Sequence, residues 1–138
     1  VDAPRLVFNK SGSEHTSALQ RFARQETRRL EALDLCGYVL KKDSPSCGLF
    51  RVRVYRPEGG APDRSGRGVF ARELCRRLPM LPVEEEGRLN DLPLRENFIE
   101  RLFAYERWTR FLREDPTPGG LVAFHTAHKL SLMAHSSS

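Results

Sequence analysis

The sequence of 138 residues contains no long hydrophobic run. Its apolar runs, such as residues 121–124, reach about four residues, whereas a membrane-spanning helix needs about 20. We therefore expect no contact with a membrane. The opening residues VDAPRL also lack the basic segment and apolar stretch of a secretory signal. Because Val1 is not an initiator methionine, we expect it to be an internal position of a longer chain.

Cysteine is scarce, and its spacing is unlike that of a disulfide-rich or zinc-binding protein. The three cysteines, Cys36, Cys47 and Cys75, are odd in number and form no C-x-x-C pair. This pattern favours a reducing compartment, and we expect a cytoplasmic protein. Cys36 and Cys75 lie in apolar segments, where a free cysteine commonly packs as a small hydrophobic side chain.

Lysine is also scarce, although the chain is basic. Four lysines stand beside 19 arginines, and the net charge is +5. An excess of arginine is typical of proteins that bind nucleic acid or another polyanion. The arginines are mixed with acidic residues, as in RQETRRLEALD, so a genome that favours arginine over lysine explains the composition equally well. Both interpretations stay open.

The hydrophobic pattern predicts an α/β layered domain, present in part, followed by an all-α segment. The N-terminal part shows strand-like runs at residues 5–9, 35–40, 50–55 and 80–83, with helices at about 16–33 and 69–78. In the first helix, Leu19, Phe22, Ala23, Leu30 and Leu33 form the expected buried stripe. The strand at 35–40 is wholly apolar and should be covered on both faces. Residues 56–68 read as a flexible connection.

The character of the chain changes after Glu84, Glu85, Glu86 and Gly87. We interpret the three glutamates as a solvated linker, or as interdomain salt-bridge partners of Arg88 or Arg95. No further strand is expected, and helices are predicted at residues 94–114 and 121–135. We therefore predict one unit at residues 1–87 and an all-helical unit at residues 88–138.

One series of motifs resembles a known bacterial family. DSPSCG at residues 43–48 is preceded by GYVLKK and followed by RVRVY and then by GRGVFARELC. This order resembles a family whose best understood members are thiouracil desulfurases. The following stretch, PVEEEGRLNDLPLRENFIERLFAYERW, looks like the junction to a helical domain of unknown function that is often fused behind it.

The resemblance implies a [4Fe–4S] cluster held by three cysteines, of which only the one in the SPSCG loop, Cys47, has a counterpart here. The motifs that carry the other two would lie upstream. The resemblance therefore implies a fragment, inactive alone, of an enzyme that removes sulfur from thiolated nucleobases or related small thiocarbonyl compounds. In the parent, an iron without a protein ligand would act as a Lewis acid on the soft thiocarbonyl sulfur.

The loop residues suit such a site on chemical grounds. A thiolate from Cys47, flanked by Ser46 and Gly48, could approach inorganic sulfide closely and offer backbone N–H groups to it. We predict Cys47 as metal ligand and Gly48 as a second cofactor-binding residue. Ser44, Ser46 and Lys42 are candidates for orienting substrate or water, although turn formation and a solvated charge explain them as well.

Two further interpretations stay open. Gly66 and Gly68 precede a predicted helix, where free N–H groups could hold an anion or a cluster sulfide, or simply form a turn. The chain could also be a non-enzymatic module that binds nucleic acid or protein. The wide apolar face of residues 98–112 predicts a homo-oligomer through the helical segment.

Overall fold

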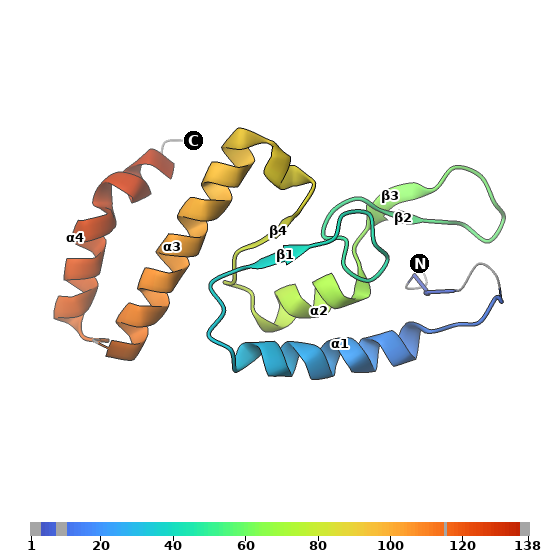
Figure 1. The fold of residues 1–138 in the computed structure, drawn as a ribbon, viewed down its shortest axis with the longest axis horizontal. Helices are drawn as coiled ribbons and strands as arrows, with labels where there is room; N and C mark the ends of the chain where they lie inside the picture. The colour runs from blue at the N-terminus through green and yellow to red at the C-terminus, as the bar shows by residue number, and fades with distance from the viewer. Residues whose placement is uncertain (1–3, 8–10, 115, 136–138) are drawn as a thin grey trace.

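The computed structural model describes residues 4–7, 11–114 and 116–135. Figure 1 shows an α/β unit followed by two long helices. The elements are α1 (Thr16–Glu31), β1 (Tyr38–Leu40), β2 (Val52–Val54), β3 (Asp63–Gly66), α2 (Val69–Arg77), β4 (Val83–Glu85), a 3₁₀ turn η1 (Arg88–Asn90), α3 (Leu92–Glu114) and α4 (Pro118–His135). The predicted fold class, α/β and then all-α, is confirmed. Among the described residues, no helix is long and apolar enough to cross a membrane.

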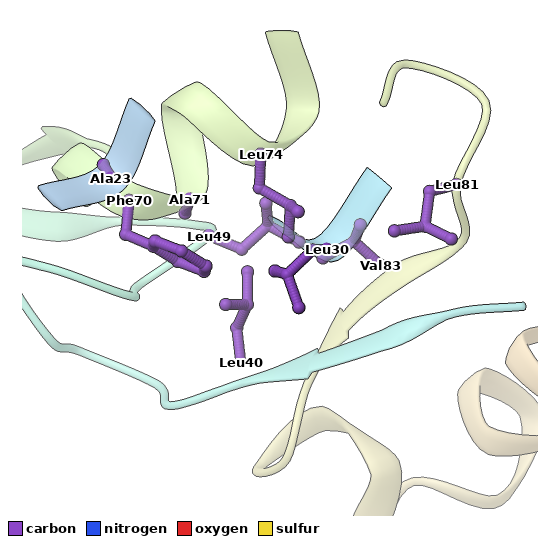
Figure 2. Packing of buried hydrophobic residues seen from close by; sticks show 9 residues of the cluster. All are labelled: Ala23, Leu30, Leu40, Leu49, Phe70, Ala71, Leu74, Leu81 and Val83. Atoms are coloured by element: carbon purple, nitrogen blue, oxygen red, sulfur yellow. The ribbon is translucent and has the colours of Figure 1, made fainter. Parts of the chain in front are cut away.

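The core lies between the β1–β4 pair and the helices α1 and α2 (Figure 2). Helix α2 contributes Phe70, Ala71 and Leu74, and its neighbours supply the rest: Ala23, Leu30, Leu40, Leu49, Leu81 and Val83. Strands β1 and β4 are parallel, with Tyr38 opposite Val83 and Leu40 opposite Glu85. Because α2 connects the β2–β3 hairpin to β4, the chain crosses over the sheet before it returns beside β1 (Figure 1).

Helix α1 buries part of the predicted stripe: Ala23 and Leu30 are confirmed, whereas Phe22 and Leu33 are not. Ala23, Thr27 and Leu30 are buried, whereas Phe22 is 56% exposed and Leu33 is 50% exposed. The buried positions recur at i, i+4 and i+7, and small side chains there let α2 lie close against α1. The Thr27 hydroxyl donates to the Ala23 carbonyl at 2.8 Å, which satisfies its polar group inside the core.

The strands also differ from the predictions. Strand β3 lies within the predicted flexible connection at 56–68, where it pairs antiparallel with β2. The last strand is β4 at Val83–Glu85 rather than residues 80–83. The predicted strand at 35–40 is shortened to β1, and Val39 is 49% exposed, so one face is open. Of the first predicted strand, Val7 forms an isolated bridge with Glu14, while residues 8 and 9 lie outside the described residues.

Helices α3 and α4 form a hairpin beside the α/β unit (Figure 1). Its helices meet through Trp108, Phe111 and Phe124, whose ring centroids lie 5.3–5.8 Å apart. Tyr105 of α3 packs against the core of the α/β unit. The division of the chain at residue 87 stays a prediction.

Candidate functional site

The cysteine loop, defined here as residues 41–50, connects β1 to β2 and is folded on itself by Ser44. The Ser44 hydroxyl oxygen accepts hydrogen bonds from the backbone N–H groups of Ser46, at 3.2 Å, and Cys47, at 3.1 Å. The Ser44 carbonyl accepts a third from the Gly48 N–H at 2.7 Å. A Cβ on Gly48 would lie 2.3 Å from Val52 and 2.8 Å from the Ser44 carbonyl oxygen. The turn therefore needs a glycine at position 48 and a short hydroxyl side chain at position 44.

The N-terminus of α2 holds the middle of the cysteine loop. The N–H groups of Val69 and Phe70 donate to the carbonyls of Pro45, at 3.1 Å, and Ser46, at 2.9 Å. The Gly68 N–H donates to the Gly48 carbonyl at 2.7 Å. Carbonyl groups of the chain therefore satisfy the first amides of this helix. These amides are already paired with backbone carbonyls, so the hypothesis that they hold an anion or a sulfide does not agree with the structure. The alternative, that the two glycines form a turn, is wrong for Gly66, which is the last residue of β3 and lies opposite Val52.

Two consecutive glutamates of the β4 end bind the two ends of the cysteine loop. One oxygen of Glu85 accepts hydrogen bonds from the N–H groups of Leu49, at 2.8 Å, and Phe50, at 3.1 Å. The Glu86 carboxylate accepts from the Lys41 ammonium at 2.8 Å and the Lys42 N–H at 2.7 Å. These two hydrogen bonds lower the pKa of Glu86 to about 2, and the one from the Lys41 ammonium has the larger effect.

The interpretation of the three glutamates as a solvated linker is therefore wrong for two of them. Glu84 and Glu85 are buried, with exposed fractions of 6% and 2%. They lie in a strand paired with β1, which brings them against the loop that follows β1. The alternative, a salt bridge to Arg88, is confirmed, because the Arg88 Nε lies 2.8 Å from a Glu84 oxygen.

Cys47 itself is half-buried against the hydrophobic core. Its thiol donates to the Ser46 hydroxyl oxygen, with 3.6 Å between Sγ and Oγ. Burial raises the pKa of the Tyr38 phenol, and the negative charge of a Cys47 thiolate raises it further. Tyr38 is therefore an electrostatic neighbour of Cys47 that the sequence pattern did not single out, since it lies on an apolar strand.

The other predicted residues take different positions around the cysteine. Ser46 is its direct neighbour, whereas the Ser44 oxygen is occupied by the turn. Lys42 is exposed, and its aliphatic stem lies against Gly87. Cys75 packs on the core as expected, but Cys36 lies before β1 and is absent from the core cluster.

The described residues do not by themselves fit a complete metal cluster. Within residues 4–7, 11–114 and 116–135, no three histidine, cysteine, aspartate or glutamate side chains gather closely enough to hold a metal ion. All three cysteines are free thiols, and each is half-buried. What this arrangement offers is one thiol at a fixed position, with a hydroxyl beside it.

A cavity of about 350 Å³ lies beside the C-terminal end of the cysteine loop. Leu49 and Phe50 line it together with three arginines, Arg67, Arg88 and Arg101. The Arg88 guanidinium carbon lies 4.9 Å from the centre of the Phe50 ring. Cys47 is not among the lining residues, so this cavity and the cysteine do not form one pocket.

Comparison with known proteins relates the chain to one family. The fold and the site together define an α/β unit that presents one cysteine on a tightly hydrogen-bonded loop. The family model for 2-thiouracil desulfurase matches residues 1–86, which includes the whole cysteine loop. The chain belongs to the 2-thiouracil desulfurase family. No curated protein and no solved structure matches the chain.

Proposed function

We propose that this chain is part of an iron–sulfur-dependent desulfurase that acts on thiolated nucleobases or related small thiocarbonyl compounds. The observation that carries the proposal is the family match over residues 1–86. In this proposal Cys47 supplies one thiolate to a [4Fe–4S] cluster of the parent protein, and the Gly48 backbone lies beside it. The remaining ligands come from segments outside the described residues, so the chain alone is inactive. The helices after residue 87 are the beginning of a fused helical domain.

The loop geometry supports different roles for its polar residues. Ser46 lies against the cysteine sulfur, so its hydroxyl is placed to donate to a thiolate or to a water molecule beside it. Ser44 orders the turn, and we propose that its contribution to substrate binding is indirect. Lys42 is exposed and supplies a positive charge that can orient a substrate carbonyl.

The test uses the full-length parent after anaerobic reconstitution. Replacing Cys47 with Ser removes a soft, charged ligand, so iron content and the rate of thiouracil desulfuration should both fall strongly. Cys75→Ala is the matched control, because Cys75 packs on the core from α2 and its loss costs about 1 kcal/mol of packing. Retention of iron and activity by Cys47→Ser would remove Cys47 from the ligand set.

A second candidate function is the binding of nucleic acid. The β2–β3 hairpin projects from the α/β unit (Figure 1) and carries exposed arginines at positions 51, 56 and 64. Tyr55, beside them, is 66% exposed, and an exposed aromatic ring among arginines can stack on an unpaired base. A filter-binding titration with single-stranded RNA, repeated at rising salt, tests this role. A double substitution Arg56→Ala and Arg64→Ala should weaken the affinity and flatten its salt dependence.

A further inference from the structure

We propose that Glu85 is the positioning residue of the site: its buried carboxylate fixes the backbone that carries Cys47. The importance of this role for catalysis rests on the proposed function, whereas the contacts that define it do not. Glu85 lies at the end of β4, opposite Leu40 of β1, and is 2% exposed. Its side-chain hydrogen bonds go to Leu49 and Phe50 rather than to Cys47, so its effect on the cysteine passes through the backbone.

The partners of this carboxylate are backbone amides. A single oxygen of Glu85 accepts the N–H groups of Leu49 and Phe50, at 2.8 and 3.1 Å. Among the described residues no arginine, lysine or histidine forms an ion pair with it. A buried carboxylate is costly unless it is hydrogen-bonded, and hydrogen bonds to a charged acceptor are stronger than neutral ones. The hydrogen bonds from Leu49 and Phe50 to Glu85 therefore fix the backbone of this part of the loop.

The loop needs such an attachment because the backbone is left-handed within it, at Asp43, and directly after it, at Arg51. Asp43 has φ of 59° and Arg51 has φ of 55°, the left-handed region that glycine adopts more readily. Strained residues of this kind persist only where the surroundings enforce them. Glu85 binds the two residues immediately before Arg51. At the other end, the Asp43 carboxylate accepts a hydrogen bond from Arg53 at 3.0 Å.

The path from Glu85 to the cysteine is short. One residue, Gly48, separates Leu49 from Cys47, and its N–H and carbonyl bond to Ser44 and Gly68. Leu49 is also a buried member of the core. Release of the Leu49 and Phe50 amides would let Arg51 relax and would loosen the segment that fixes Cys47.

The experiment measures the thiol directly in this chain, without cluster or substrate. Alkylation of Cys47 by iodoacetamide is followed by peptide mass spectrometry, with Cys36 of the same molecules as internal reference, because Cys36 lines a different cavity from Leu49 and Phe50. In Glu85→Ala, the ratio of the Cys47 rate to the Cys36 rate should rise roughly tenfold, because two hydrogen bonds that hold the loop closed are lost. In Glu85→Gln, which keeps one acceptor oxygen, the ratio should stay within about twofold.

Three outcomes would overturn the proposal: an unchanged ratio in a folded Glu85→Ala, equal acceleration at both cysteines, or a Gln variant that behaves like the Ala variant. If Glu85→Ala does not fold, hydrogen exchange of the unsubstituted chain decides instead. The opening equilibrium constant measured by exchange of the Leu49 and Phe50 amides should then equal the one derived from the rate of Cys47 alkylation. Unequal constants would mean that the two segments open independently, which overturns the proposal. None of these readouts needs desulfurase activity, so failure of the proposed function would be seen separately.

Discussion

Gly68 is the position at which the contact between α2 and the cysteine loop can be tested most sharply. Its own backbone, with φ of −60° and ψ of 147°, is open to any residue. Space is what restricts it: a Cβ would lie 2.2 Å from the Ser46 carbonyl oxygen, 2.4 Å from the Ser46 carbonyl carbon and 2.8 Å from the Cys47 nitrogen. All three are backbone atoms, so no side chain can rotate away to make room.

Gly68→Ala should therefore separate the loop from the helix. Overpacking of this kind costs about 1–3 kcal/mol, and each lost backbone hydrogen bond adds about 1 kcal/mol. The bonds at risk are those from Val69 to Pro45 and from Phe70 to Ser46. We expect the free energy of unfolding to fall by about 3–5 kcal/mol. Urea denaturation followed by circular dichroism measures it.

Gly119→Ala is the matched control for this substitution. Gly119 lies in the first turn of α4, and the nearest atom to an added Cβ, the Thr117 hydroxyl oxygen, is 3.9 Å away. Since alanine is the better helix former, the control should stabilise the chain by up to about 1 kcal/mol. If Gly68→Ala changed stability by less than about 0.5 kcal/mol, the close approach between α2 and the loop would be refuted.

Three further predictions concern the loop ends and the helical hairpin. Arg51→Gly should raise the free energy of unfolding by about 1 kcal/mol in urea, because it relieves a left-handed φ of 55°. The pKa of Glu86 is lowered, so its contact with Lys41 should stabilise the fold fully above pH 4.5. This contribution should fade as the pH falls toward 2. Glu86→Gln should remove that part of the dependence of stability on acid pH. Phe103 is 58% exposed on α3, and Phe103→Lys should reduce self-association in sedimentation velocity if this face joins two copies.

Local patterns predicted the helices well. Helix α2 at Val69–Arg77 and helix α3 at Leu92–Glu114 lie within about two residues of their predicted bounds, because helical periodicity and the position of Pro93 are local signals. Strand β3 carried no such signal: its residues, DRSG, have low strand propensity and are largely exposed. It forms because β2 offers a partner, and that pairing cannot be read from either segment alone.

The candidate site was predictable only in part, for the same reason. DSPSCG identified the loop and its cysteine. The role of Glu85 could not be predicted, because the residues that it binds lie 35 and 36 positions earlier in the sequence. A run of three glutamates after a strand normally indicates a solvated segment. Here the parallel pairing of β1 and β4 places two of them inside the molecule.

The order of the cysteine loop therefore depends on the α/β unit around it. Its Pro45 and Ser46 carbonyls are bound by the first turn of α2, its last two amides by Glu85, and the Lys42 amide by Glu86. Each of these partners follows the loop in sequence and must be in place before the strained conformations at Asp43 and Arg51 can persist. A peptide with the SPSCG sequence would have a cysteine of the same chemistry but no fixed position for it. Folding of the α/β unit already orders the loop, so the entropy of ordering it is not lost again when the thiol binds its partner. A side chain that binds a metal or a substrate requires this form of preorganisation.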